Sequence, residues 1–154
     1  FIEKMIEIIL FQPEIPQNTG NIGRICAFCN CKLHLIHPLG FKINDKQLRR
    51  AGMDYWTSLD LYEYEDWDDF WNSKNRPKKI YLLTTHADNS IWEAEFQAGD
   101  GLLFGNEGHG TPKHIHDSVD YRIRIPKFKD NLRSLNLAVS VGIATYEALR
   151  QISL

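Results

Sequence analysis

The carboxyl-terminal third of the chain contains the run Ile123-Arg124-Ile125-Pro126, which leads through a short polar segment to Arg133-Ser134-Leu135-Asn136-Leu137. The first run is typical of a β-strand, and the second opens a long segment with the apolar pattern of a helix. In open α/β sheets, ligands bind outside the carboxyl ends of the strands, and the first turn of a helix offers N–H groups without partners. We therefore expect a ligand site where this strand gives way to this helix.

Two other segments have the same design. The apolar run Met5–Phe11 leads to Asn18-Thr19-Gly20-Asn21-Ile22-Gly23-Arg24, and Leu102-Leu103-Phe104 leads to Gly105-Asn106-Glu107-Gly108-His109-Gly110. Glycines allow a tight turn and the close approach of a backbone to a ligand. Three such junctions in one small chain predict a single composite site.

Length and composition indicate an ordinary globular protein. The 154 residues, of which 43% are hydrophobic and 25% charged, predict a single domain, 1–154, that is large enough for a real core. Met5 is the expected natural start, with residues 1–4 as an extension before it. No apolar run approaches the roughly 18 residues that cross a bilayer, so no membrane association is expected. Three cysteines, an odd count, and the lack of a secretory signal favour a reduced, cytoplasmic setting.

Charge is unevenly distributed along a chain whose net charge is −2. Residues 60–69 (DLYEYEDWDD) are strongly acidic, whereas residues 46–50 and 122–133 are basic. Solvated helix faces are the simplest interpretation of such runs. Local basic patches can nevertheless bind phosphates on a mildly acidic protein, so the pattern permits a nucleic-acid partner without requiring one.

Strand-length apolar runs alternate with helical patterns, which predicts an α/β fold with a mostly parallel sheet covered by helices. The expected strands are Ile6–Phe11, Lys32–Ile36, Lys79–Thr84, Gly101–Gly105 and Tyr121–Ile125. The expected helices are Gly20–Asn30, Asp45–Ala51, Asp66–Lys74, Pro112–Asp117 and Ser134–Gln151. Asp45 and Asp66 are expected N-caps, and Pro112 suits a first helical turn. In the last helix a wide apolar stripe contains Leu135, Ala138, Val139, Gly142, Ile143, Tyr146 and Leu149.

Each candidate site residue also has a purely structural interpretation. Glu107 could accept hydrogen bonds from a ligand, or it could cap the helix that begins near Pro112. Arg24 could bind a phosphate through paired hydrogen bonds, or it could simply be exposed. Taken singly, Ser134 and Asn136 are better explained as helix caps. Mid-helix Tyr146 is expected in the core, and Trp67 and Trp71, four residues apart, are expected to pack together.

Conventional cofactor and metal motifs receive little support. Neither Gly-x-Gly-x-x-Gly nor the phosphate-binding Gly-x-x-x-x-Gly-Lys-Ser/Thr motif is present, and no nucleophile elbow is visible. The run Cys26-x-x-Cys29-x-Cys31-x-x-His34-x-x-His37 contains enough ligands for zinc. However, Cys26 and Cys29 fall on a predicted helix, and strand alternation sends His34 to the opposite face. Buried, unreactive thiols and no metal are therefore the favoured interpretation.

Taken together, the three junctions resemble the motifs of the SPOUT (knotted) RNA methyltransferases, most closely the TrmL/YibK-like tRNA 2′-O-methyltransferases. The matching segments occur in order along nearly all of residues 5–151. They are residues 13–22 (PEIPQNTGNI), 37–41 (HPLGF), 48–55 (LRRAGMDY), 104–107 (FGNE), 123–126 (IRIP), 134–137 (SLNL) and 146–148 (YEA). So long an ordered match is far more specific than any one motif.

The resemblance implies a carboxy-terminal trefoil knot whose loops bind S-adenosylmethionine, and a homodimer with its site at or near the subunit interface. The positions that match cofactor contacts are Leu83, Gly105, Ile125 and Ser134. The implied substrate is the wobble nucleotide, in the anticodon loop of certain leucine tRNAs, methylated on its ribose 2′-oxygen. The positions that match catalytic or substrate-placing residues are Asn18, Arg24, Glu107, Ser134, Asn136 and, in the nearest relatives, Tyr146.

The sequence departs from this family at two loops. Where related chains often have Glu-Thr-Arg-Gly, this chain has Glu107-Gly108-His109-Gly110, and the segment after Pro126 is more basic. The expected reaction is direct, in-line transfer of the sulfonium methyl to a ribose hydroxyl, with no metal and with Arg24 nearest the hydroxyl. Three alternatives stay open: a non-catalytic RNA-binding module on the same scaffold, 2′-O-methylation of a different RNA position, and an enzyme for another adenosine-containing ligand.

Overall fold

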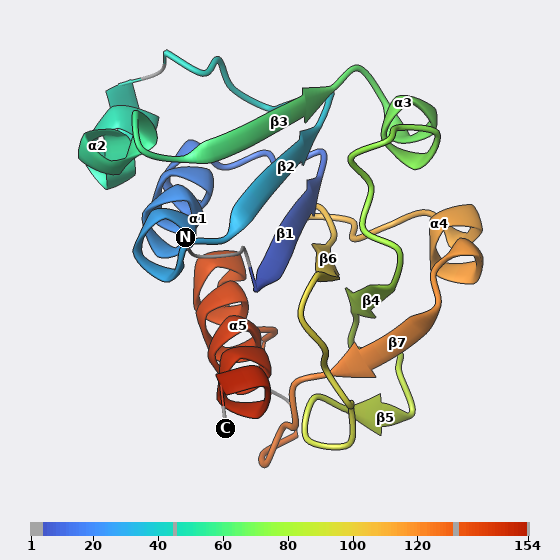
Figure 1. The fold of residues 1–154 in the computed structure, drawn as a ribbon. Coiled ribbons are helices and arrows are strands. Elements are labelled where there is room, and N and C mark those ends of the chain that lie inside the picture. The colour runs from blue at the N-terminus through green and yellow to red at the C-terminus, as the bar shows by residue number, and fades with distance from the viewer. Residues whose placement is uncertain (1–4, 45, 131–132, 154) are drawn as a thin grey trace.

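In a computed structural model, which describes residues 5–44, 46–130 and 133–153, strands and helices alternate along most of the chain (Figure 1). The strands are β1 (Ile6–Phe11), β2 (Lys32–Ile36), β3 (Asp60–Tyr64), β4 (Ile80–Leu83), β5 (Asn89–Ser90), β6 (Asp100–Phe104) and β7 (Tyr121–Arg124). The helices are α1 (Pro16–Cys29), α2 (Lys46–Trp56), α3 (Trp67–Trp71), α4 (Lys113–Ser118) and α5 (Leu137–Ser153).

The strands form one seven-stranded sheet in the order β3-β2-β1-β6-β4-β7-β5, and each of its strand pairs is parallel. At the centre, Ile8 of β1 lies opposite Leu33 of β2 and Leu102 of β6. The predicted α/β fold with a mostly parallel sheet is confirmed. Since the strands run the same way, their carboxyl ends all meet at one edge of the sheet.

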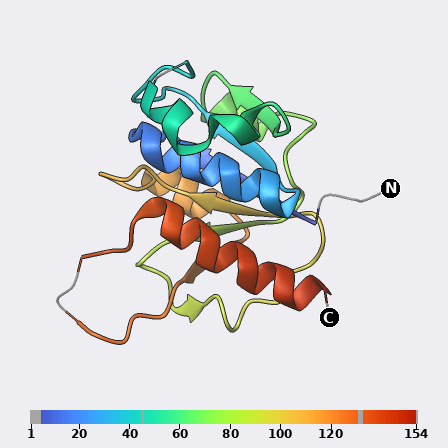
Figure 2. The same ribbon diagram turned by 90° about the vertical axis from the view of Figure 1, so that its left-hand side faces the viewer.

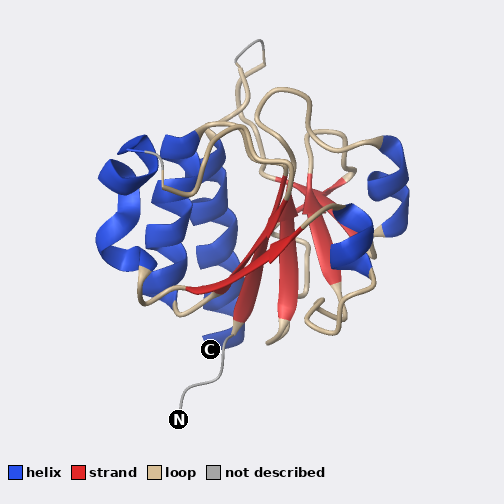
Figure 3. Ribbon diagram, turned by 90° about the horizontal axis from the view of Figure 1, so that it is seen from above, coloured by secondary structure: helices blue, strands red, loops and turns tan. Residues whose placement is uncertain are grey.

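Helices cover both faces of the sheet, with α1, α2 and α5 on one side and α3 and α4 on the other (Figure 3). Alternate residues of β1 supply the two cores: Ile6, Ile8 and Leu10 pack toward α1 and α5, whereas Ile9 and Phe11 pack toward α3 and α4. Burial on both faces explains why the central strands are continuously apolar. In the part of the chain that is described, no helix combines the length and apolarity needed to span a membrane.

Strand β7 lies next to one edge of the sheet, and after it the chain returns to the middle of the sheet. There α5 packs beside α1 and against β1 and β6, and Figure 2 shows the two helices next to each other. A return of this kind, back over strands already laid down, is what a carboxy-terminal knot requires; the knot itself stays a prediction.

Several element boundaries differ from the sequence-based prediction for local reasons. Helix α1 begins four residues early, at Pro16, because proline suits a first helical position where no N–H is needed. Helix α5 begins at Leu137 rather than Ser134. Helix α2 continues to Trp56, and the expected N-cap Asp45 lies outside the described residues. Pro112 is the residue before α4 rather than part of its first turn.

For the acidic run and the residues that follow it, one prediction was wrong and two are confirmed. Residues 60–64 form the edge strand β3, so the interpretation of this run as a helix face was wrong there. An edge strand tolerates exposed charges such as Glu63, and that hid the strand from an apolar pattern search. Asp66 caps α3 by accepting from the Asp69 N–H, as predicted, and the rings of Trp67 and Trp71 stack 5.3 Å apart.

Helix α5 has apolar residues on two faces. Its buried face consists of small side chains, among them Ala138, Val141 and Ala144. The predicted stripe lies largely on the other face: Val139 is 49% exposed and Tyr146 52% exposed. The expectation that Tyr146 belongs to the core was therefore wrong.

Candidate active site

The carboxylate of Glu107, in the loop after β6, holds the loop between β1 and α1. It accepts hydrogen bonds from the backbone N–H groups of Glu14 and Ile15, both at 2.9 Å, and from the side-chain amide of Asn18 at 3.3 Å. A carboxylate with three donors is a strong anchor, because hydrogen bonds to an ionised group are about twice as strong as neutral ones. The alternative that Glu107 caps the helix near Pro112 is wrong, since α4 has no side-chain cap.

Asn18 links Glu107 to the third junction, the loop between β7 and α5. It is a buried residue in the first turns of α1, and its side-chain oxygen accepts a hydrogen bond from the Asn136 amide at 2.9 Å. The oxygen of Asn136 in turn accepts from the N–H groups of Ala138 and Val139, which caps the start of α5. The chain Glu107–Asn18–Asn136 thus joins the loops after β1, β6 and β7 at the carboxyl edge of the sheet.

Asn106 is a site residue that the sequence analysis missed. Its side chain is buried; its oxygen accepts from the Gly108 and His109 N–H groups, and its amide donates to the carbonyl of Gln12 at 2.7 Å. Asparagine often forms such local turns, and the sequence Gly-Asn-Glu-Gly was the available signal. Asn106 therefore shapes the turn that presents Glu107.

Glycine is required at both ends of this turn. The backbone of Asn106 pairs with that of Gly110 in both directions, at 2.9 and 3.0 Å. A Cβ on Gly105 would lie 2.6 Å from the Gly110 carbonyl carbon, and Gly110 has a φ of +66°, which side chains rarely adopt. The glycines seen in the sequence thus close the turn tightly around Asn106 and Glu107.

Three of the four predicted cofactor positions lie at neighbouring strand ends. Leu83 ends β4, where it pairs with Phe104 of β6 and Ile123 of β7. Gly105 and Ile125 follow those two partner strands. Leu83 and Ile125 are half-buried and pack on the core, and Leu83 lies between the strand end that leads to Gly105 and the one that leads to Ile125. Apolar side chains next to backbone N–H and C=O groups are typical of small-molecule sites, and they suit an adenosine-containing cofactor.

Ser134 lies exposed in the loop after β7, two residues before Asn136. It is therefore in the same loop as the α5 cap. Its role as a cofactor contact stays a prediction.

Arg24 lies on α1 apart from the Glu107–Asn18–Asn136 chain. Six residues separate it from Asn18, or about 9 Å along a helix axis. Its guanidinium lies over the ring of Tyr55, 4.9 Å from the ring centre, on an exposed side of α1. Within one subunit, the structure therefore does not bring Arg24 into contact with the hydrogen-bonded chain.

Tyr146 lies further away still. It is ten residues after Asn136, about 15 Å along α5, and its hydroxyl is hydrogen-bonded to the thiol of Cys29 at the end of α1. Burial raises the pKa of the Cys29 thiol, and the bond to that thiol raises the pKa of Tyr146. Both groups lie where α1 and α5 pack together.

The cysteine and histidine run does not gather around one point. His34 is buried on the opposite face of the sheet from Cys26, as strand alternation predicted, with its ring nitrogens bonded to Tyr64 at 2.8 Å and Glu7 at 2.7 Å. Among the residues that the structure describes, no group of three or more His, Cys, Asp or Glu side chains could hold a metal ion.

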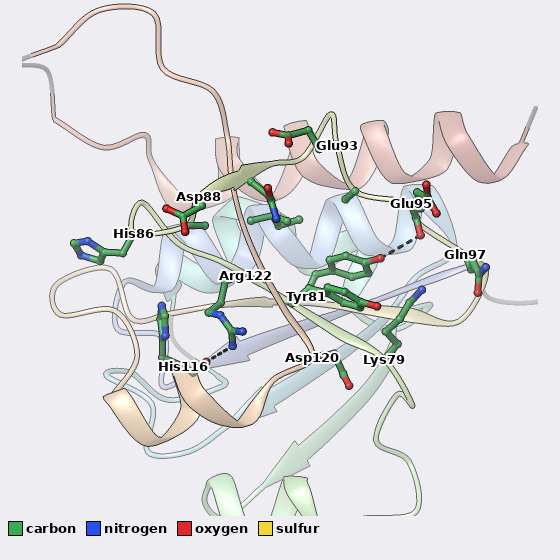
Figure 4. Close-up of a pocket in the computed structure, with 15 residues that line it drawn as sticks. Lys79, Tyr81, His86, Asp88, Glu93, Glu95, Gln97, His116, Asp120 and Arg122 are labelled. Carbon is green, nitrogen blue, oxygen red and sulfur yellow. Dashed lines mark hydrogen bonds between the residues drawn. The ribbon is translucent and has the colours of Figure 1, made fainter.

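A groove of about 790 Å³ lies elsewhere, beside β4 and β7 (Figure 4). Tyr81 donates to the Glu95 carbonyl there, and Arg122 donates to the carbonyl of His116. The charged residues that line the groove are Lys79, Arg122, Asp88, Glu93, Glu95 and Asp120. Their acidic excess disfavours RNA phosphates, and none of the predicted site residues lines this groove.

Comparison with known proteins identifies the family of the chain. Residues 5–146 match the SpoU rRNA Methylase family. The chain belongs to this family. A tRNA (cytidine(34)-2'-O)-methyltransferase of Yersinia pestis is 45% identical over 154 residues, covering 96% of this chain and 94% of the relative.

Solved structures show the same SpoU-type fold. One, described as giving structural insights into the 2-OH methylation of C/U34 on tRNA, superimposes with a TM-score of 0.89 at 42% identity, covering 96% of each chain. An AdoMet-bound rRNA methyltransferase from Sinorhizobium meliloti superimposes with a TM-score of 0.86 at 22% identity, covering 97% of this chain and 57% of that one. The second likeness shows the fold alone.

Proposed function

We propose that this chain transfers a methyl group from S-adenosylmethionine to the ribose 2′-oxygen of the wobble nucleotide of tRNA, with leucine tRNAs among its substrates, in the cytoplasm. The observation that carries the proposal is the hydrogen-bonded chain Glu107–Asn18–Asn136, which gathers three loops at the carboxyl edge of the sheet. The Yersinia pestis relative, named for 2′-O-methylation of cytidine 34, supports the choice of substrate.

The cofactor would lie against Leu83, Gly105, Ile125 and Ser134. When bound, S-adenosylmethionine would supply a methyl group on a sulfonium sulfur to the ribose oxygen, with S-adenosylhomocysteine as the other product and the hydroxyl proton released to water. The strand pairing that places Leu83 between the ends of β6 and β7 fixes the apolar walls. Membership of the SpoU rRNA Methylase family supports a methyl donor of this kind here.

The contribution of Asn18, Glu107 and Asn136 is to hold geometry. Both ends of the Asn18 amide are used within the protein, and the Glu107 oxygens already accept three hydrogen bonds. Fixing the loops that carry two reactants lowers the barrier by aligning them, an effect worth up to about 7–11 kcal/mol in well-oriented cases. These three are therefore positioning residues.

Arg24 is the proposed contact to the RNA backbone. The guanidinium of an arginine stays protonated at neutral pH and therefore cannot act as a base. The proposed role of Arg24 is to hold a phosphate and polarise the target hydroxyl. Packing over Tyr55 orients the guanidinium while its exposed position leaves it accessible to RNA.

A homodimer would complete the site. The outer faces of α1 and α5, which pack side by side, expose large apolar groups: Phe28 at 75%, Ile143 at 41% and Tyr146 at 52%. Contiguous exposed apolar surface marks an interface, and two-fold dimers are the commonest assembly. Arg24 is four residues before Phe28, on the same side of α1. Burying this face would bring Arg24 and Tyr146 of one subunit against the other subunit.

Transfer of labelled methyl groups to RNA tests the proposal. Purified protein is incubated with methyl-labelled S-adenosylmethionine and, separately, with total tRNA and ribosomal RNA from cells that lack the gene. Label is expected in tRNA and not in ribosomal RNA. Label in ribosomal RNA alone would favour a different RNA position, and incorporation into neither would favour a non-catalytic RNA-binding module.

A further inference from the structure

Two aromatic side chains, Trp92 and Phe128, lie against each other on the surface yet stay open to solvent. Their ring centres are 5.9 Å apart with planes inclined by 37°, and the residues are 61% and 87% exposed. Both are apolar side chains, whose burial away from water is favourable. The contact between the two rings leaves most of their surface exposed, so the pair is available to a ligand.

The backbone around Trp92 is firmly held. The N–H of buried Ile91 donates to the Arg124 carbonyl at 2.9 Å, and the Trp92 N–H donates to the Ser90 hydroxyl oxygen at 3.1 Å. The guanidinium of Arg124 donates to the carbonyls of Ala87 and Asp88, which ties the segment before β5 to the end of β7. Trp92 is therefore presented outward from a fixed turn rather than from a loose loop.

Phe128 connects this pair to the candidate active site. It lies in the loop that leaves β7, passes beside β5 (Figure 2), and ends at Asn136, the cap of α5. Trp92 follows β5, so both rings lie beyond the carboxyl ends of parallel strands, at the edge where Glu107, Asn18 and Asn136 meet. Phe128 and Ser134 belong to the same connection, between β7 and α5.

The charge of the Phe128 loop favours RNA over protein. Lys127 and Lys129 flank Phe128, and Arg133 follows in the same loop, against one acidic residue, Asp130. Next to Trp92, the carboxylate of Glu93 accepts a hydrogen bond from the Ser90 N–H at 3.0 Å and lines the neighbouring acidic groove. Lysine is depleted in protein–protein interfaces, whereas aromatic faces edged by cations are typical of proteins that stack single-stranded bases. Bases inside a duplex cannot reach such a face.

We propose that Trp92 and Phe128 form a stacking platform for an unpaired nucleobase of the RNA substrate, next to the nucleotide that receives the methyl group. The platform rests on the proposed function, which it deepens by naming how the RNA strand is held. Stacking of one base on aromatic side chains is worth about 1–3 kcal/mol, which corresponds to a 5- to 150-fold change in affinity.

Fluorescence tests the platform without relying on catalysis. Trp92 is more exposed than Trp67, which is 7% exposed, so RNA that stacks on Trp92 should quench the tryptophan emission. A 17-nucleotide anticodon stem-loop is titrated into the wild-type protein and into Trp92→Phe, Trp92→Leu, Phe128→Tyr and Phe128→Leu. Tyr121→Ala, an exposed aromatic at the other end of β7, is the matched control.

Quenching by the stem-loop is expected for wild type but not for a blunt RNA duplex, and it should be largely lost in Trp92→Phe. The two leucine variants should bind the stem-loop at least about fivefold more weakly, while the aromatic replacements and Tyr121→Ala keep wild-type affinity. The platform would be overturned if both leucine variants bound the stem-loop with wild-type affinity. It would also be overturned if the substitutions changed the assembly of subunits and left the affinity for RNA unchanged. If the wild type binds the stem-loop but transfers no methyl group, the proposed function fails while the platform stands.

Discussion

The side-chain amide of Asn136 donates a hydrogen bond to the side-chain oxygen of Asn18 at 2.9 Å, across a sequence separation of 118 residues. The same Asn18 side chain donates to Glu107. Three loops far apart in the sequence are therefore connected by the side-chain amide of Asn18. If this amide rotated by 180°, its NH2 group would face the NH2 group of Asn136 and its oxygen would face the Glu107 carboxylate. The site depends on this fixed orientation.

Replacing Asn136 with Asp separates two roles of this residue. An aspartate can still cap α5, so the free energy of unfolding should change by less than about 1 kcal/mol. It cannot donate to Asn18, and loss of loop alignment should lower methyl transfer by about 10²-fold. Initial rates and urea unfolding measure the two effects. The exposed loop residue Asn75, changed to Asp, is the control, and a wild-type rate in Asn136→Asp would remove the bridge from the account.

Replacing Glu107 with Gln keeps the size of the side chain but offers one acceptor oxygen to the donors on Glu14, Ile15 and Asn18. Hydrogen bonds to a charged group contribute about 1.5–3 kcal/mol, so a loss of this order in unfolding free energy is expected, together with reduced S-adenosylmethionine binding. Calorimetry and chemical denaturation provide the measurements. The exposed Glu95→Gln change should alter neither quantity, and an unaltered Glu107→Gln protein would show that the anchor is dispensable.

Replacing Ile143 with Glu tests the proposed homodimer. The outer face of α5 would then present a charge to the partner subunit, so the protein should become a monomer by light scattering and lose methyl transfer. Lys113→Glu, on α4 and on the other side of the sheet, is the matched charge change. A wild-type protein that is already monomeric at micromolar concentration, or a dimeric Ile143→Glu variant, would contradict the dimer.

Asp100 gives a pH-dependent prediction for stability. Burial raises the pKa of its carboxyl above the ordinary value of 3.8, despite the nearby Lys79 ammonium. The folded state then holds the proton more tightly than the unfolded state, so stability contributed by Asp100 is present at low pH and declines as pH rises through the raised pKa. Asp100→Asn should remove this decline. Urea midpoints of both proteins between pH 3.5 and 6 measure the difference, which should move in favour of the variant as pH rises; a constant difference would refute this role.

The sequence predicted the centre of this fold well and its edges poorly. Strands β1 and β2 matched the predicted bounds because burial on both faces makes them continuously apolar. Strand β3 was missed because, at the edge, alternating Tyr62 and Tyr64 are interrupted by charges. Residue pattern alone also could not show that α5 buries its small residues and leaves larger apolar ones exposed.

The candidate site was predictable where it follows from topology. Parallel strands must bring their carboxyl ends together, so the meeting of Asn18, Glu107 and Asn136 was expected, and it is observed. Asn106 was missed because a buried asparagine in a glycine-rich turn looks like any turn residue. Arg24 was a candidate phosphate ligand by residue type and by resemblance, and Tyr146 was a candidate site residue by resemblance alone. Neither argument could show that both lie apart from the Glu107–Asn18–Asn136 chain within one subunit.

The most direct test of the central claim is to locate the modified nucleotide. A ribose 2′-O-methyl group removes the hydroxyl that attacks the neighbouring phosphodiester in alkali, so the modified position resists alkaline cleavage. After incubation of unmodified tRNA with the protein and S-adenosylmethionine, the account predicts a single resistant linkage, on the 3′ side of nucleotide 34. Methylated tRNA that is fully cleaved by alkali, or a resistant linkage elsewhere, would contradict it.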